Sequence, residues 1–377
     1  MNVSPTKGDA AKVAADRPLH YGSGFILPVH PPAMNIRNGI IEAIGHTPLI
    51  GLKRASEETG CTILGKAEFM NPGQSVKDRA GRQIILEAEK RGDIRAGGLV
   101  VEATAGNTGI GLALVANARG YRTLIVIPET QSQEKKDALR LFGAQLVEVP
   151  AVPYSDPNNY QHIGRRLAEK LREREPNGVL YSDQWNNLDN RKAHYVSTGP
   201  EIWDDLQGKV DGFICSIGTG GTLAGVSSYL REKKKGIVIG VADPRGAAMY
   251  NLFAHGEAKV SEGSSISEGI GLGRVTPIIE DMKVDKAYLV SDEEALPIVF
   301  DLMEREGLCM GGSTGINVAG AIRLAKELGP GKTIVTILAD YGTRYQSKLF
   351  NQAFLREKGL PVPNWLERKV EVPNVFK

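Results

Sequence analysis

Short apolar runs alternate with helical patterns through most of the chain. The apolar runs are rich in β-branched residues and predict strands at 99–102, 124–127, 146–149, 179–181, 213–217, 238–241 and 334–338. They lack polar alternation, as expected of strands that are covered on both faces. Stretches with helical periodicity lie between them, at 107–118, 133–142, 160–174, 223–233, 293–306 and 317–328. This alternation predicts an α/β fold with mainly parallel sheets, in which ligands bind beyond the carboxyl ends of strands.

Both ends of the chain lack this alternation. Residues 1–35 are rich in proline and have no helical period, so we expect an extended N-terminal arm. Residues 356–377 are expected to form a C-terminal tail. Between them we expect an N-terminal α/β domain over 36–190 and a C-terminal α/β domain over 191–355.

Composition narrows the function classes. The chain has 377 residues and a net charge of +2, so neither nucleic acid nor an anionic membrane surface is an expected partner. No segment has 18 consecutive apolar residues, so no membrane span is expected. Three cysteines without CxxC spacing predict neither a disulfide framework nor a metal site. We expect a cytoplasmic protein; a mitochondrial location would follow if the arm were a transit peptide, although Asp9 and Asp16 weigh against that.

A glycine-rich turn, Gly218-Thr219-Gly220-Gly221-Thr222, follows one predicted strand and opens a helix. Glycines let the backbone approach an anion, and the first N–H groups of a helix lack internal partners, so the turn favours phosphate binding. Two other interpretations stay open. One is a merely tight structural turn, and the other is a dinucleotide site with Asp243 as its ribose-binding acid.

Three further segments carry candidate chemistry. The segment 104–109 is a second anion-ready helix start, suited to a small carboxylate or simply to helix capping. Lys77 lies in the first turn of a helix that Ser75 can cap, where the helix dipole disfavours a lysine. It is either a Schiff-base lysine or a solvated lysine paired with Asp78 or a nearby glutamate. Ser313 either caps the helix that follows it or contacts a ligand.

Together these motifs resemble the fold-type II pyridoxal-phosphate (PLP) enzymes, of the tryptophan synthase β-like fold. Within them the chain is most similar to the branch of O-acetylserine sulfhydrylase (cysteine synthase) and cystathionine β-synthase. The resemblance runs from about Ile41 to Phe350 and rests on the motifs IGHTPL, SVKDR, EATAGNTGIGLA, SIGTGGT, EGIG and GGSTG.

The resemblance implies a role for each matching residue. Lys77 would form the Schiff base with PLP, Asn107 would contact the ring hydroxyl, and Ser313 would face the pyridine nitrogen. The phosphate would be bound by Gly218, Thr219, Gly220, Gly221 and Thr222. The substrate would be bound by Thr104, Ala105, Gly106, Thr108, Gln184 and Gly269.

The implied reaction is synthesis of L-cysteine from O-acetyl-L-serine and sulfide through an α-aminoacrylate. The alternative is cystathionine β-synthase activity or the use of O-phosphoserine, because Glu268 is typical of cystathionine β-synthases and Arg274 could meet an anionic leaving group. Ala105 stands where most relatives have serine. The resemblance also implies a homodimer and, as for some sulfhydrylases, serine acetyltransferase as a partner. Two hypotheses from other function classes are an NAD-dependent dehydrogenase and a non-catalytic scaffold that binds a partner enzyme.

Overall fold

The computed structural model describes residues 36–104, 106–369, 371–373 and 375. The predicted N-terminal arm and Ala105 lie outside the described residues. Residues 37–377 form one compact unit. No helix within the described residues is long and apolar enough to cross a bilayer.

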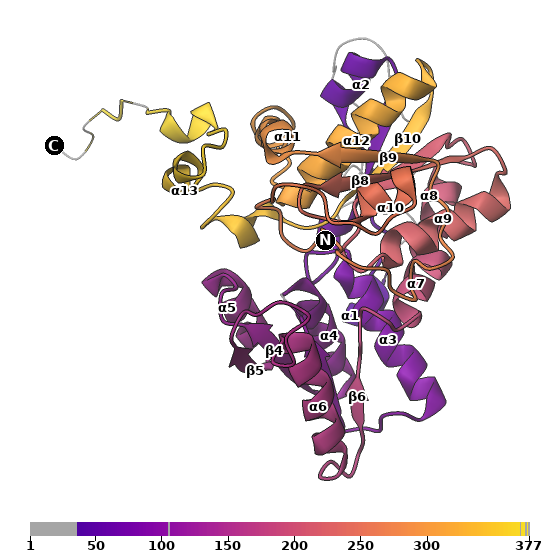
Figure 1. Cartoon of the computed structure of the whole chain (residues 1–377), viewed down its shortest axis with the longest axis vertical. Coiled ribbons are helices and arrows are strands. Elements are labelled where there is room, and N and C mark those ends of the chain that lie inside the picture. The colour runs from indigo at the N-terminus through magenta and orange to yellow at the C-terminus, as the bar shows by residue number, and fades with distance from the viewer. Residues whose placement is uncertain (1–35, 105, 370, 374, 376–377) are drawn as a thin grey trace, which may run out of the picture. The chain divides into compact units, whose positions relative to one another are not determined.

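Two sheets organise this unit (Figure 1). The larger has the strand order β1-β2-β10-β7-β8-β9 and is parallel except for β1, which is antiparallel to β2. The smaller has the order β5-β4-β3-β6 and is parallel throughout. The strands are β1 (Leu49–Gly51), β2 (Thr62–Ala67), β3 (Leu99–Ala103), β4 (Arg122–Pro128), β5 (Gln145–Val149), β6 (Val179–Tyr181), β7 (Gly212–Cys215), β8 (Val238–Pro244), β9 (Lys286–Val290) and β10 (Thr333–Leu338).

Helices connect these strands. The α-helices are α1 (Ile40–Ala43), α2 (Lys53–Thr59), α3 (Lys77–Arg91), α4 (Asn107–Arg119), α5 (Gln133–Leu141), α6 (Tyr160–Arg172), α7 (Asp189–Ala193), α8 (Gly199–Asp205), α9 (Gly221–Lys233), α10 (Met249–His255), α11 (Asp292–Glu306), α12 (Gly312–Leu328) and α13 (Gln352–Glu357). A π-helix, η2 (His194–Thr198), joins α7 to α8. Short 3₁₀ helices occur at η1 (Glu68–Met70), η3 (Gly342–Tyr345) and η4 (Asn364–Glu367).

Both faces of the larger sheet are covered, which explains why its central strands read as continuous apolar runs. Successive residues of β7 point to opposite sides. Phe213 belongs to the core that includes α9, whereas Ile214 belongs to the core that includes α12. In the smaller sheet, Ile125 packs with α4 and α5, and Leu124 packs with α6. Each turn between a strand and its helix is therefore held at a sheet edge by buried apolar residues on both sides.

The larger sheet includes two strands that lie within the expected N-terminal domain. Strands β1 and β2 precede the smaller sheet in sequence, yet they belong to the larger one, because β2 pairs in parallel with β10. The larger sheet thus takes strands from residues 49–67 as well as from the second half of the chain. Hydrogen bonding in sheets is non-local, so the order of motifs along the chain does not reveal it.

Candidate active site

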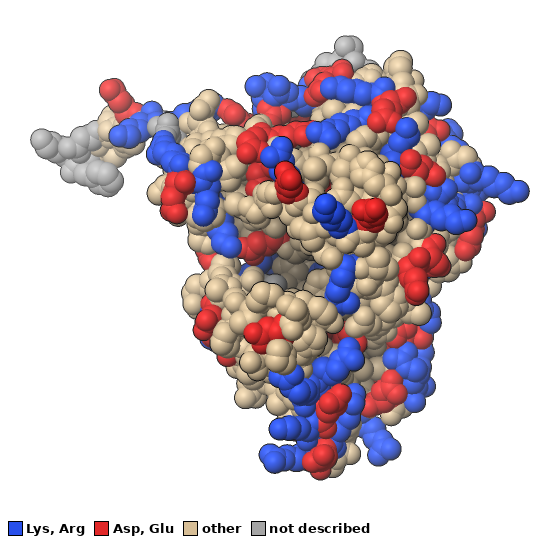
Figure 2. Space-filling view, viewed as in Figure 1, with Lys and Arg blue, Asp and Glu red and all other residues tan. Residues whose placement is uncertain are grey.

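A cavity of about 220 Å³ lies where the turns of both sheets meet. Figure 2 shows a recess in the molecular surface, between the part over α5 and the part over the larger sheet. On the same face, Lys and Arg are interspersed with Asp and Glu, in keeping with the small net charge. Predicted site residues that line the cavity are Lys77, Thr104, Gly106, Asn107, Thr108, Gln184, Gly218, Thr219, Gly269 and Ser313. Gly220 and Thr222 line an adjoining pocket that shares Lys77 and Gly218 with the first.

Lys77 is the first residue of α3 and reaches the cavity. The backbone N–H of Lys77 donates to Ser75 Oγ at 3.3 Å, so Ser75 supports the helix start as expected. Val76 N donates to Ala339 O at 2.9 Å, which ties this turn to the end of β10. Burial lowers the pKa of Lys77, against the attraction of Asp340, Cys215 and Glu68. The structure therefore contradicts the solvated lysine and agrees with an amine prepared for chemistry.

Asp78 is likewise not a surface partner of Lys77. It is fully buried, and its Oδ2 accepts a hydrogen bond from Gly73 N. Burial raises the pKa of Asp78 to about 7, against that hydrogen bond. Asp78 therefore acts on the Asn71–Ser75 turn that precedes the helix.

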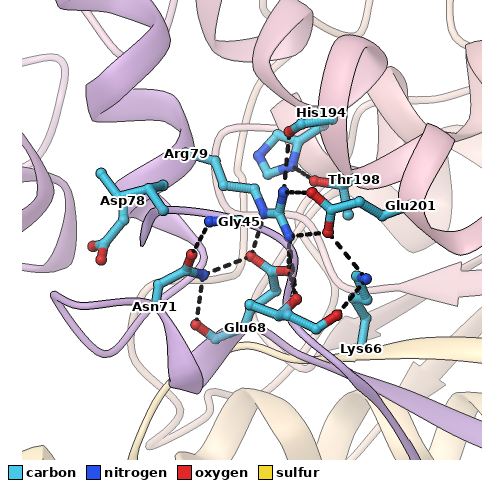
Figure 3. A network of polar contacts seen from close by, with 12 residues as sticks. Gly45, Lys66, Glu68, Asn71, Asp78, Arg79, His194, Thr198 and Glu201 are labelled. Atoms are coloured by element: carbon cyan, nitrogen blue, oxygen red, sulfur yellow. Dashed lines mark hydrogen bonds and ion pairs between the residues drawn. The ribbon is translucent and has the colours of Figure 1, made fainter. Parts of the chain in front are cut away.

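A buried ion network fixes the first turn of α3 (Figure 3). Arg79, which is fully buried, donates Nε and Nη2 to Glu68, both at 2.7 Å. It also donates Nη1 and Nη2 to Glu201 at 2.6 and 2.7 Å. Lys66 Nζ lies 3.0 Å from Glu201 Oε2, so β2, η1, α3 and α8 share one cluster. Burial acts to raise the pKa of Glu201, but Arg79 and Lys66 lower it to about 2. Arg79 lies two positions after Lys77 in the same helix, so this network holds the backbone that carries the lysine.

The predicted phosphate turn begins α9. Gly220 has φ +95°, and a Cβ on it would lie 2.1 Å from Ile279 Cγ2. A Cβ on Gly218 would lie 2.2 Å from Gly269 O, so no side chain fits at either position. Thr219 Oγ1 accepts from Asn190 Nδ2 at 2.8 Å. The turn is thus a backbone-lined concavity at the N-terminus of a helix of 13 residues, the geometry that suits an anion.

Of the predicted phosphate residues, Gly221 lines neither pocket, and a Cβ on it would meet Asn190 Oδ1 at 2.2 Å. Thr222 Oγ1 lies 3.2 Å from His194 Nε2, and His194 Nδ1 lies 2.8 Å from Thr198 Oγ1. Burial lowers the pKa of His194 well below its usual value, so the imidazole is neutral. The π-helix η2 therefore supports the turn through the contact between His194 and Thr222.

The second helix start, at α4, lies on the smaller sheet. Thr104 and Thr108 are buried, and Thr108 Oγ1 contacts Gln184 Oε1. Gln184 N donates to Glu102 Oε2 at 3.2 Å. Glu102 is a fully buried strand residue whose pKa burial raises to about 8. Glu102 escaped the sequence analysis because it stands inside an apolar run, but it positions Gln184.

Asn107 lines the cavity with both ends of its amide engaged. Its Nδ2 donates to Asp340 Oδ2 at 2.7 Å, and its Oδ1 accepts from Arg344 Nη1 at 2.6 Å. Tyr345 OH also donates to Asp340. Asp340, Arg344 and Tyr345 follow β10, and sequence reasoning missed them. The one local signal was their position just beyond the carboxyl end of a predicted strand.

The structure changes the expectations for Ser313 and Asp243. Ser313 lies inside α12, which begins at Gly312 rather than at Asn317, so Ser313 does not cap that helix. It lines the cavity instead. Asp243 Oδ2 accepts from Tyr250 N at 2.8 Å at the start of α10, so it is not a free ribose-binding acid. This removes the residue on which the dinucleotide interpretation depended.

Glu268 is part of the cavity lining, whereas Arg274 is not. Glu268 lines the cavity and pairs with Lys135 and Lys348. Arg274 lies 4.3 Å from the Tyr154 ring centroid and donates to Gln161 Oε1 at 3.3 Å. Because Arg274 stacks on Tyr154 outside the cavity lining, its expected contact with a leaving group is not supported. Within the described residues, no cluster of His, Cys, Asp and Glu could hold a metal ion.

Comparisons with known proteins agree with this geometry. Residues 40–340 match the family described as pyridoxal-phosphate dependent enzyme. Cysteine synthase 1 of Neurospora crassa is 48% identical over 347 residues, which cover 90% of this chain and 91% of the relative.

Two further relatives belong to the cystathionine β-synthase branch. Cystathionine β-synthase of Dictyostelium discoideum is 36% identical over 88% of this chain and 65% of the relative. The crystal structure of the O-acetylserine-dependent cystathionine β-synthase of Helicobacter pylori superposes with a TM-score of 0.73. It shares 33% identity and covers 84% of this chain and 99% of that one.

Proposed function

Because the chain belongs to the pyridoxal-phosphate-dependent enzymes, we propose that it makes L-cysteine from O-acetyl-L-serine and sulfide. The similarity to Neurospora crassa cysteine synthase 1, at 48% identity over nine tenths of both chains, carries the choice of reaction. The pocket supports the reaction class, since it joins a lysine of lowered pKa to two glycine-rich helix starts.

The residues of the pocket fit the cofactor. The concavity at 218–222 admits no Cβ at Gly218 or Gly220 and presents helix N–H groups, as a phosphate requires. Asn107 would hold the ring hydroxyl, Ser313 the pyridine nitrogen and Lys77 the aldehyde carbon. When bound, PLP supplies an electron sink for the electron pair left on Cα when the α-proton departs.

Lys77 would act as the proton acceptor at Cα. Burial lowers its pKa, so a larger fraction of its Nζ is neutral near pH 7 than for a solvated lysine. The network of Arg79 holds the helix turn beneath it, so the amine keeps its direction toward the cavity. The same nitrogen can return the proton after the new bond to Cβ has formed.

The start of α4 would bind the substrate carboxylate. Thr104, Gly106, Thr108 and Gln184 surround one end of the cavity, and the helix dipole favours a negative charge there. The backbone N–H of Gln184 donates to Glu102 Oε2, and Gln184 Oε1 accepts from Thr108 Oγ1. Gln184 would therefore be positioned before the substrate arrives. Ala105 supplies no hydroxyl, so backbone N–H groups and the two threonines would carry this task.

Cystathionine synthesis is the second candidate. Glu268 favours it, because the residue lines the cavity and is typical of that branch. The alternatives differ in the group that leaves Cβ of the first substrate, which is acetate, phosphate or water, and in the thiol that replaces it.

Initial rates with a panel of substrates test the proposal. O-acetylserine, O-phosphoserine and serine are each combined with sulfide or homocysteine. We expect O-acetylserine with sulfide to give the highest kcat/KM. If serine with homocysteine gave the highest value, the enzyme would be a cystathionine β-synthase.

We also propose that the enzyme is a cytoplasmic homodimer that binds serine acetyltransferase. These three statements rest on the resemblance of the sequence to the sulfhydrylases. Sedimentation of the purified protein tests the dimer, co-purification tests the partner, and cell fractionation tests the location.

A further inference from the structure

Glu268 is held between two lysines at the wall of the cavity. Its Oε2 pairs with Lys135 Nζ and its Oε1 pairs with Lys348 Nζ, so each carboxylate oxygen has a cationic partner. The side chain of Lys135 is 3% exposed and that of Glu268 is 15% exposed. We call Lys135, Glu268 and Lys348 the clasp.

The clasp joins segments that are distant in sequence. Lys135 is in α5, which packs on the smaller sheet, whereas Glu268 precedes β9 and Lys348 follows η3. Lys135 Nζ also lies 5.0 Å from the ring centroid of Tyr345, another residue of the cavity lining. Lys135 and Glu268 therefore belong to the wall, and Lys348 pairs with Glu268 from outside the lining.

The charge of the clasp is defined by these contacts. Burial acts to raise the pKa of Glu268, but Lys135 and Lys348 lower it below its ordinary value, so the carboxylate is ionised. Two ammonium groups and one carboxylate leave the cluster with an excess of one positive charge. Because each oxygen of Glu268 faces a lysine, the clasp offers no free negative charge to a cation that enters the cavity.

The lining contains one other acid, whose contacts differ from those of Glu268. Among the described residues that line the cavity, the acidic side chains are Glu268 and Asp340. Asp340 Oδ2 accepts from Asn107 and Tyr345, and its Oδ1 is buried. An ammonium group that entered with a second substrate would find each oxygen of Glu268 already paired with a lysine, and Asp340 Oδ1 shielded by burial.

We propose that the clasp selects the nucleophile, admitting hydrosulfide and excluding thiols that carry an ammonium group. This inference rests on the proposed function and adds the determinant of its second substrate. Glu268 alone would favour an amino-acid thiol, because a free carboxylate binds its ammonium. Lys348 and Lys135 occupy both oxygens of that carboxylate. Paired in this way, Glu268 disfavours an amino-acid thiol instead of binding it.

The test removes one cation while keeping the length of the side chain. Lys348→Met frees Glu268 Oε1, and Lys348→Arg keeps the charge. Lys286→Met is the matched control, because Lys286 pairs with Glu327 at 2.7 Å elsewhere on the protein. Each holoenzyme receives O-acetylserine with one of four nucleophiles: sulfide, 3-mercaptopropionate, cysteamine or L-homocysteine. The readout is kcat/KM for the nucleophile, split into kcat and KM.

We expect Lys348→Met to raise kcat/KM for cysteamine and homocysteine relative to sulfide by about tenfold, mainly through KM, since one charge-assisted contact is gained. Lys348→Arg and Lys286→Met should keep the wild-type ratios. In Glu268→Gln/Lys348→Met the gain should vanish, because the carboxylate that receives the ammonium is gone.

Three results would overturn the inference. The ratios could stay within twofold of wild type in Lys348→Met. The gain could persist in the double variant. Homocysteine and 3-mercaptopropionate could fall together in Lys348→Met, which would mean that the lysines bind the carboxylate of the thiol. A wild-type enzyme with no sulfide turnover would instead contradict the proposed function, so the two failures are distinct.

Discussion

Lys77 shows how burial converts an ordinary residue into a reactive one. In isolation its segment reads as a lysine beside an aspartate at a helix start. The structure instead places the lysine at the cavity, and burial lowers its pKa. The motif SVKDR identified the residue, but the ionisable groups around the amine are Asp340, Cys215 and Glu68, which the motif does not contain.

Substitution of Lys77 tests its role as proton acceptor and cofactor attachment. Lys77→Ala and Lys77→Arg should each reduce kcat by at least about 10²–10⁴-fold, since the neutral amine is lost. Because the pKa of Lys77 is lowered, the wild-type rate should rise with pH through a value below that of free lysine, and this limb should be absent from both variants. Borohydride reduction and peptide mapping should place the cofactor on the Lys77 peptide of the wild type alone.

Lys53→Ala serves as the control, because the Lys53 side chain is 80% exposed and is not part of the cavity lining. A cofactor adduct on another lysine of the wild type would contradict the assignment.

At the level of elements, apolar periodicity predicted seven strands within a few residues of their observed bounds. It missed β1, β2 and β9. Strand β2 contains Gly65 and Lys66, and Lys66 is tolerated in a buried strand because Glu201 and Asp205 pair with it. Helix α12 begins earlier than expected because its glycine-rich start has no apolar period.

The candidate site was predictable where its residues are adjacent in sequence. Thr104, Gly106 and Thr108 of one turn and Gly218 and Thr219 of the other line the cavity. Gly220 and Thr222 line the adjoining pocket. Lys135, Asp340 and Tyr345 were not predictable, because each comes from a different segment and only the tertiary fold brings them to Glu268 and Asn107.

Gly220→Ala tests the turn at the start of α9. Alanine at φ +95° is strained, and its Cβ would overlap Ile279, so we expect a loss of at least about 2 kcal/mol in the free energy of unfolding. The turn would also shift, so the dissociation constant for PLP should rise at least about tenfold, as equilibrium dialysis would measure.

Gly256→Ala is the matched control. Gly256 has φ +81°, but nothing lies within 4 Å of a Cβ there, so it carries the backbone strain without the overlap. We expect a smaller loss of stability, about 1 kcal/mol, and unchanged affinity for PLP. Equal effects of the two substitutions would mean that the turn does not form the phosphate site.

At the scale of the whole molecule, the cavity collects residues from both sheets. Thr104 and Asn107 follow a strand of the smaller sheet, and Gly218 and Thr219 follow a strand of the larger one. A ligand that contacts all of them binds the folded state and stabilises it by mass action.

Removal of PLP should therefore lower the melting temperature of the whole unit. Saturation at 1,000 times Kd corresponds to about 4 kcal/mol, so we expect a decrease of several degrees in calorimetry. Added PLP should restore the value, and inorganic phosphate should restore part of it through the turn at 218–222. An apoenzyme that melts at the holoenzyme temperature would show that the cofactor does not bridge the sheets.

The parallel pairing of β2 with β10 also has a consequence for synthesis on the ribosome. Thr62 pairs with Thr333, so β2 waits for about 270 further residues before its partner exists. At 5–20 residues per second this delay is roughly 15–50 s, while the smaller sheet, built from residues 99–181, can already close. One edge of β2, with Ile63 and Leu64, stays unpaired throughout, and an open apolar strand edge is prone to aggregation. We therefore expect the nascent chain to depend on chaperones until its last strand emerges.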